Sequence, residues 1–340
     1  MTYLKLEYIW VGGNNELRSK TKVLKKSLVN DNTLKPEELP EWNYDGSSTS
    51  QATGEDSEVL LKPVAVYNDP FRGENSFFVL CDTWLPNGEP HPTNTRVSAK
   101  EIFDKALDKE PWFGMEQEFF VMDVNTNLPL GFPNNGFPNP QGQYYCSVGA
   151  SNAYGREFFE EALDNCLKAG LPVTGTNFKV CAGQLEIQVC STGISQGDNL
   201  LVTRYILQRT GEKYNLNVDF RAKPVKGDWN GSGCHTNFST KEMRENENGY
   251  ELILEAIEKL RVNHKLHIES YGNDNHERLT GLHETAHYSQ FSSGVANRGA
   301  SIRIPRTSKK HGKGYFEDRR PSSSCDPYVV TSLLFKTCCL

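Results

Sequence analysis

The spacing of apolar residues divides this chain into a strand-rich N-terminal part and a longer part in which strands and helices alternate. In the N-terminal part, apolar runs are separated by polar turns rich in glycine, asparagine and aspartate, a pattern typical of β-strands. We expect strands at residues 4–11, 59–67 and 77–84, and only residues 24–29 have a pattern compatible with a helix. Three prolines and Gly88 between residues 85 and 95 indicate a boundary. We therefore expect a small β-rich domain over residues 3–88 and a larger domain over residues 95–340.

Beyond residue 95 the apolar period changes repeatedly between that of a helix and that of a strand. Ser98 and Glu101 form a capping box, which predicts a helix ahead of Ile102. Further helices are expected at residues 156–169, from Asp198, and around 250–270, and strands at 185–189, 218–223 and, as the last one, 301–304. A glycine- and proline-rich stretch at residues 131–142 predicts a long loop.

Two carboxylates stand one residue apart in an aromatic, strand-like segment at residues 112–122. In a strand, Glu116 and Glu118 would leave the same face of the sheet, while Gln117 leaves the other face. Two anions held side by side repel each other, so a cation, an arginine, a shared proton or exposure to water must offset the repulsion. The alternative is that both glutamates lie on the solvated rim of an edge strand.

Composition and charge exclude several classes of protein. The chain of 340 residues has 37% apolar residues and a net charge of -6, which suits two globular cores and disfavours nucleic acid as a partner. No long uncharged apolar run is present, so no membrane segment is expected. The nine cysteines form no CxxC pair, which argues against a zinc site or a disulfide framework. A reduced, cytoplasmic compartment fits this pattern best.

Three more residues are candidates for a metal site together with Glu116 and Glu118. Glu186 lies in an apolar strand-like run, His235 lies in a loop of small residues, and Glu317 follows two aromatic residues. Carboxylates with one histidine and no thiolate suit Mg²⁺ or Mn²⁺ better than structural zinc. Each of these residues alone is a weak signal.

Three arginines surround the short apolar strand near residue 302. An apolar strand seldom carries Arg298, Arg303 and Arg306 without an anion, and the guanidinium group fits phosphate oxygens. Acidic metal sites combined with arginines favour phosphoryl transfer. No Walker loop or dinucleotide-binding glycine motif is present, so a nucleotide would be held in another way.

Residues 283–287 match the HExxH motif of zinc metalloproteases. That motif works only on a helix, where both histidines share one face. Gly281 precedes the segment and serines with Gly294 follow it, without helical periodicity. A chance match in a loop is the competing interpretation, and the one we favour.

Nearly the whole chain resembles eukaryotic-type glutamine synthetase. The segments that carry the resemblance are residues 41–49, 69–72, 112–118, 140–146, 229–237 and 314–321. The resemblance implies an α+β fold, with a small N-terminal β-grasp domain followed by a large α/β catalytic domain that has a curved antiparallel sheet. It also implies a homo-oligomer of two stacked rings with active sites between subunits. In such rings the loop with Asp45 enters the neighbouring site and helps to deprotonate ammonium.

The reaction implied by the resemblance joins glutamate and ammonia with ATP and Mg²⁺ or Mn²⁺ through γ-glutamyl phosphate. The positions that match ligands of the metal on the nucleotide phosphates are Glu116, His235 and Glu317. Those that match ligands of the metal near the glutamate carboxylate are Glu118 and Glu186. The positions that match glutamate contacts are Trp229, Gly231, His235, Arg278 and Arg319, and the flap residue is Glu284. Nucleotide and phosphate contacts correspond to Asn237, Phe238, Ser239, Arg298, Arg303 and Tyr315. The catalytic set is Asp45, Glu284, Arg298 and Arg319.

The chain departs from the family pattern in several places, and residue 179 is the departure that bears most on the chemistry. Lys179 stands where the family has a third carboxylate for the metal near glutamate, which changes the site by two charges. At metal–ligand distance a unit charge is worth on the order of 4 kcal/mol even at an effective dielectric constant near 20. Two functions therefore remain open: a glutamate–ammonia ligase, and a catalytically impaired paralogue with a structural or regulatory role in a ring.

Overall fold

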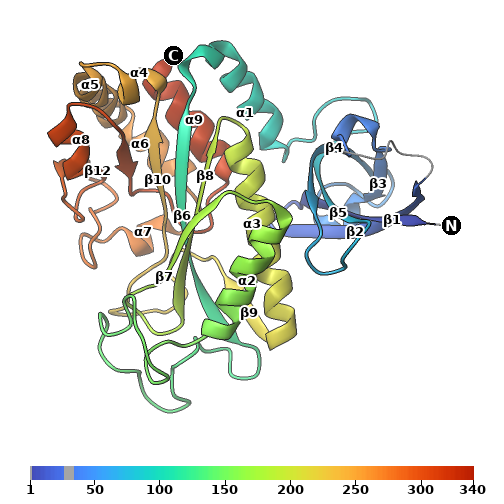
Figure 1. Ribbon diagram of the computed structural model, residues 1–340, viewed down its shortest axis with the longest axis horizontal. Coiled ribbons are helices and arrows are strands. Elements are labelled where there is room, and N and C mark those ends of the chain that lie inside the picture. The colour runs from blue at the N-terminus through green and yellow to red at the C-terminus, as the bar shows by residue number, and fades with distance from the viewer. Residues whose placement is uncertain (1, 27–33) are drawn as a thin grey trace.

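A computed structural model describes residues 2–26 and 34–340, and it contains two β-sheets (Figure 1). The N-terminal sheet has the strand order β2-β1-β5-β4-β3. Its strands are β1 (Tyr3–Val11), β2 (Leu17–Lys25), β3 (Trp42–Asp45), β4 (Glu58–Asn68) and β5 (Ser76–Trp84). Strands β1 and β5 are parallel and the other neighbours are antiparallel. The three strands predicted in this part are confirmed.

The helix expected at residues 24–29 is wrong where the structure describes it. Leu24 and Lys25 belong to β2, which pairs along its whole length with β1. Residues 27–29 lie outside the described residues. Pairing with β1 decides the conformation here, because a neighbouring strand satisfies the backbone groups of residues with a weak helical preference.

The larger sheet has the order β11-β12-β13-β10-β6-β8-β7, and β9 pairs with the end of β6. These strands are β6 (Trp112–Asp123), β7 (Val173–Phe178), β8 (Gln184–Thr192), β9 (Leu216–Asp219), β10 (Cys234–Ser239), β11 (Ser293–Val295), β12 (Ile302–Ile304) and β13 (Phe316–Asp318). All neighbours except β11 and β12 are antiparallel. The sheet curves through the centre of the molecule (Figure 1). Strand β6 lies between β10 and β8, so the edge-strand alternative for its two glutamates is wrong.

Helices cover the sheet and enclose its core. They are α1 (Thr95–Phe103), α2 (Arg156–Ala169), α3 (Ser195–Tyr214), α4 (Lys241–Glu245), α5 (Gly249–Val262), α6 (His264–Ser270), α7 (Asn275–Arg278), α8 (Arg306–His311) and α9 (Pro327–Cys339), with 3-10 turns at Pro36–Glu38, Gly46–Thr49 and Asp104–Lys109. Phe119 and Val121 of β6 pack in one core with α2 and α3. No helix in residues 2–26 and 34–340 is long and apolar enough to cross a membrane.

The helix at residues 156–169 is confirmed, whereas other helix limits differ because tertiary contacts set them. Helix α1 begins at Thr95, so Ser98 lies inside it and forms no cap. Thr95 donates a hydrogen bond to Asp326, which fixes the first turn. Asp198 also lies inside its helix, where it binds Arg96. The helix expected at 250–270 is interrupted at Asn263, between α5 and α6.

Strand limits in the larger part of the chain also differ from the predicted limits. Strand β9 ends at Asp219, whose carboxylate accepts hydrogen bonds from Arg221 and so turns the chain away from the sheet. Strand β8 continues to Thr192 because it pairs with β6 over its full length. Strand β12 is not the last strand, because β13 follows it. The predicted loop at residues 131–142 contains no helix or strand.

A buried polar junction joins the N-terminal sheet to helix α3. The Glu7 carboxylate of β1 accepts hydrogen bonds from Ser19 (2.6 Å) and from Tyr205 of α3 (3.1 Å), and it pairs with Arg72 at 2.8 Å. Ile9 and Phe78 from the same sheet share a core with α2 and α3. The N-terminal sheet is therefore joined to helix α3 by apolar packing and by the hydrogen bond from Tyr205 to the Glu7 carboxylate.

Candidate active site

The register of four strands brings the five predicted metal ligands to one face of the larger sheet. Glu116 of β6 lies opposite His235 of β10, and Glu118 lies opposite Glu186 of β8. On the other side of β10, Glu317 of β13 lies opposite the residue two positions after His235. The strand period of two keeps Gln117 on the back of the sheet, where it accepts a hydrogen bond from buried Arg204. The same-face prediction for the two glutamates is confirmed.

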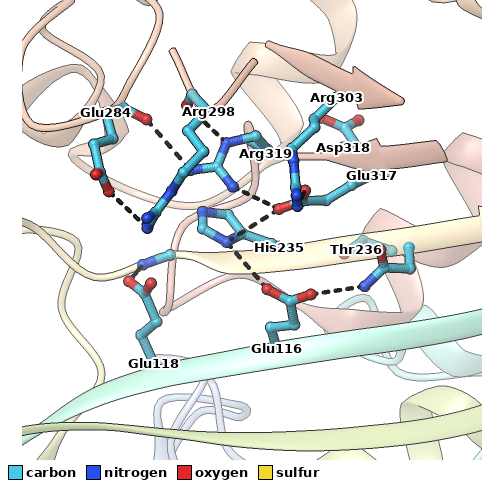
Figure 2. A network of polar contacts seen from close by, with 12 residues as sticks. Glu116, Glu118, His235, Thr236, Glu284, Arg298, Arg303, Glu317, Asp318 and Arg319 are labelled. Carbon is cyan, nitrogen blue, oxygen red and sulfur yellow. Dashed lines mark hydrogen bonds and ion pairs between the residues drawn. The ribbon is translucent and has the colours of Figure 1, made fainter. Parts of the chain in front are cut away.

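Glu116, His235 and Glu317 form a cluster that could hold a metal ion. One ligand atom from each lies within 4.8 Å of the others. His235 Nδ1 is 3.4 Å from a Glu116 oxygen and 3.5 Å from a Glu317 oxygen. Dashed lines mark both contacts in Figure 2. Burial, and next the charge of Arg319, lower the pKa of His235 to about 3. The imidazole is therefore neutral, which is the form that binds a divalent cation.

Arginines connect this cluster to the loop that carries Glu284. Glu317 receives Arg319 at 2.6 Å and Arg303 at 3.0 Å. Arg319 Nε also donates to the backbone oxygen of Arg298 at 3.0 Å, and the Arg298 guanidinium pairs with Glu284 at 2.7 Å. Figure 2 shows this chain of contacts running from the sheet to the loop. Three guanidinium groups beside a candidate metal site make a site suited to phosphate or carboxylate oxygens.

Lys179 lies between the other two carboxylates. Its Nζ is 2.8 Å from Glu118 Oε1 and 2.7 Å from Glu186 Oε2, and all three side chains are buried. Burial alone would lower the pKa of Lys179, but the two carboxylates raise it well above its ordinary value. Burial likewise opposes ionisation of Glu118, yet mainly the Lys179 charge lowers the pKa of Glu118 to about 2. An ammonium group thus fills the position between the two predicted ligands of the second metal.

A pocket beside these residues gathers several other predicted positions. It is lined by Glu118, Lys179, Val180, Asn230, Gly231, His235, Arg278, His283, Glu284, Thr285, Arg298 and Arg319. Arg278 is buried and donates to the backbone oxygens of Arg319, Arg320 and Pro321. Asn237 donates to Glu116 at 2.9 Å.

The remaining predicted positions lie around this pocket or apart from it. Trp229 packs on Phe132 and does not line the pocket. The Phe238 side chain is buried in the core, so only its backbone could contact a nucleotide. Ser239 accepts a hydrogen bond from Arg244, and Tyr315 is partly exposed. Asp45 is exposed at the end of β3, which Figure 1 shows well apart from β6.

The HExxH segment forms a loop, so the metalloprotease interpretation is wrong. His283 and Glu284 have positive φ angles of 51° and 61°, which no α-helix contains. His283 pairs with Asp228, and His287 contacts Ser289. The two histidines therefore do not converge on one ligand position.

Comparison with known proteins identifies the family. A family model described as the glutamine synthetase catalytic domain matches residues 93–251. The chain is 53% identical to the chloroplastic/mitochondrial glutamine synthetase of Arabidopsis thaliana, over 97% of this chain and 76% of that protein. It is 52% identical to cytosolic isozyme 1-1 of Oryza sativa subsp. japonica and 54% identical to the nodule isozyme of Medicago sativa, each over 97% of this chain and 92% of the relative. The chain belongs to the glutamine synthetase family.

Membership of the glutamine synthetase family agrees with the fold expected from the sequence. The chain is an α+β protein with an N-terminal strand domain and a glutamine synthetase catalytic domain built on a curved sheet. Two contacts at the site were not predicted. The backbone N–H of Gly233 donates to Glu118 at 2.7 Å, and Gln188 donates to Glu186 at 3.1 Å. Gln188 stands two residues after Glu186 on β8, so the strand period was a signal for its position.

Proposed function

We propose that this protein ligates ammonia to glutamate with ATP, giving glutamine through γ-glutamyl phosphate. The observation that carries the proposal is the cluster of Glu116, His235 and Glu317 beside Arg303 and Arg319, in a chain about half identical to glutamine synthetases. A carboxylate oxygen of glutamate attacks the terminal phosphorus of ATP and ADP leaves. Ammonia then attacks the carbonyl carbon, and inorganic phosphate leaves.

The described contacts support separate roles for the residues in this reaction. Glu116, His235 and Glu317 would hold Mg²⁺ or Mn²⁺, which supplies positive charge to the nucleotide phosphates. Arg298 and Arg303 bind phosphate oxygens, with nucleotide contacts from Asn237, Phe238, Ser239 and Tyr315. Arg319 and Arg278 bind glutamate, with Trp229 and Gly231 beside them. Glu284 closes the pocket, and its pair with Arg298 couples that closure to phosphate binding.

The glutamate-side set is proposed with one change from the family pattern. Glu118 and Glu186 do not fit a divalent cation here, because the Lys179 ammonium lies within 2.8 Å of both. This observation also favours a second candidate function. A paralogue with weak or no turnover could bind the nucleotide and act as a structural or regulatory subunit in a ring of active copies.

We infer an assembly of two stacked rings with active sites between subunits. The Asp45 carboxylate is exposed and accepts hydrogen bonds from Ser47 and Ser48, and those bonds lower its pKa. Because β3 lies apart from β6, Asp45 would serve the site of a neighbouring copy, where it would accept a proton from ammonium. Multi-angle light scattering at micromolar concentration tests this. A monomer would contradict both the ring and the site that depends on it.

The ligase proposal is tested by γ-glutamyl hydroxamate formation from glutamate, hydroxylamine and ATP with Mg²⁺. Unaltered protein should form the product, and Glu317→Gln should lose at least roughly a hundredfold in rate, because it removes one metal ligand and the partner of two arginines. No product from a folded oligomer would instead favour the second candidate.

We also propose a cytosolic location, which is supported by nine free cysteines in the described residues.

A further inference from the structure

We propose that the Lys179 ammonium is a resident cation that takes the place of a divalent metal between Glu118 and Glu186. Each active site would then bind one divalent cation, at Glu116, His235 and Glu317. The inference rests on the proposed function only for the identity of the substrate, because the number of bound metal ions can be measured without turnover.

The pair of carboxylates requires a cation. Glu118 and Glu186 are directly opposite each other on neighbouring strands, and both are buried. Like charges at such a cross-strand position repel, and little water is present to screen them. Lys179 is the cation that the structure places between them, at 2.7 and 2.8 Å. It satisfies both carboxylates at once.

The four carboxylate oxygens of this pair each have a donor already. In Glu118, one oxygen is paired with Lys179 and the other accepts the Gly233 N–H at 2.7 Å. In Glu186, one oxygen is paired with Lys179 and the other accepts Gln188 Nε2 at 3.1 Å. A Mg²⁺ ion needs oxygen ligands at about 2.0–2.1 Å in octahedral geometry. Such an ion would have to displace the ammonium that occupies this space.

The backbone around Lys179 holds the ammonium in place. Lys179 follows β7 directly, and its N–H donates to the Gln184 oxygen at 2.9 Å, which closes the short connection to β8. The next residue, Val180, accepts the Gly142 N–H at 2.9 Å. These backbone hydrogen bonds fix the main chain of Lys179, so the position of its side chain does not depend on a flexible loop.

Lys179 also borders the pocket that we assign to the substrate. Lys179 lines that pocket together with Arg278, Arg298 and Arg319. An ammonium group has three N–H donors, and two are directed at the carboxylates. No third partner of Lys179 is found in residues 2–26 and 34–340. We assign the third donor to an anionic oxygen of the substrate, a carboxylate or the phosphoryl group formed on it.

Counting bound Mn²⁺ tests the assignment. Equilibrium dialysis with elemental analysis should give one Mn²⁺ per chain for the unaltered protein at saturation. Lys179→Glu and Lys179→Gln should each give two, and the second ion should broaden the Mn²⁺ electron paramagnetic resonance lines, since both sites share one sheet face. Lys213→Glu is the matched control. It makes the same charge change at an exposed pair with Glu161 and should bind one ion.

Thermal unfolding of Lys179→Gln gives a second readout. In this variant Mn²⁺ would be bound by Glu118 and Glu186 alone, so the result does not depend on the carboxylate that Lys179→Glu introduces. Saturating Mn²⁺ should raise the melting temperature of Lys179→Gln by at least about 3 °C more than it raises that of the unaltered protein, because the ion would neutralise a buried anionic pair. Two ions per chain in unaltered protein would overturn the assignment. So would one ion in both variants with equal melting shifts. One ion per chain in the unaltered protein and two in the variants support the assignment even where no hydroxamate forms. Failure of the assignment is therefore distinct from failure of the ligase proposal.

Discussion

Replacing Arg319 with lysine should separate the charge of this residue from its geometry. The guanidinium makes three directed contacts, to the Glu317 carboxylate (2.6 Å), to the Arg298 oxygen (3.0 Å) and to the Glu284 oxygen (3.3 Å). It therefore connects the sheet to Glu284 and Arg298, whose loops line the pocket. Lysine keeps the positive charge but has one nitrogen, so we expect it to keep the Glu317 contact and lose the two loop contacts.

The size of the effect follows from those two contacts. A hydrogen bond from a charged donor contributes about 1.5–3 kcal/mol, so losing two has an upper limit of about 3–6 kcal/mol. Water in the pocket will replace part of this, which leaves about 2–4 kcal/mol. In kcat/KM for hydroxamate formation, that is a loss of roughly 30- to 900-fold. Most of the loss should be in kcat, because the loop must be ordered for the transition state.

The control for Arg319→Lys is Arg221→Lys, because the Arg221 guanidinium is exposed and pairs only with Asp219 within the described residues. This variant should keep kcat/KM within about twofold of the unaltered protein. A loss of less than threefold in Arg319→Lys, at an unchanged melting temperature, would refute the reasoning. An equal loss in the control would refute it as well, since the loss would then not depend on the contacts of Arg319.

Two further predictions concern the metal cluster and the junction between the sheets. His235→Ala should weaken binding of a Mg²⁺-bound ATP analogue at least about tenfold by calorimetry, with exposed His276→Ala as the control, and equal affinity would contradict the proposed ligand set. Glu7→Gln should reduce the free energy of unfolding by about 2–3 kcal/mol at pH 7. Burial alone would raise the pKa of Glu7, but hydrogen bonds from Ser19 and Thr21 and the charge of Arg72 lower it. The Glu7 carboxylate therefore stabilises the fold at pH values above its ordinary pKa of 4.5. This stabilisation is lost as the pH falls through the lower pKa that Glu7 has in the folded protein. The difference in free energy of unfolding between Glu7→Gln and the unaltered protein should therefore become smaller below pH 4.5. Urea titrations measure it, and a difference that stays constant with pH would contradict the prediction.

Helix and strand limits illustrate what sequence patterns could not decide. The helix at residues 156–169 was predicted correctly, because Gly170 ends it with a left-handed conformation that its neighbours do not favour. The start of α1 was wrong, because a hydrogen bond from Thr95 to Asp326 crosses a separation of 231 residues. Local propensity contains no information about such a partner. The division into domains over residues 3–88 and 95–340 stays a prediction.

The sequence by itself determined that Glu116 and Glu118 share one face of a strand, since the two-residue period of a strand is a local property. The long motifs also determined the family. The tertiary structure decided which residue faces each glutamate, because strand register depends on partners far apart in the chain. It placed His235 opposite Glu116 and Glu186 opposite Glu118. It also decided the role of Lys179. From the sequence, a lysine among metal ligands is a charge in the wrong place, whereas in the fold it lies between two carboxylates that need a cation.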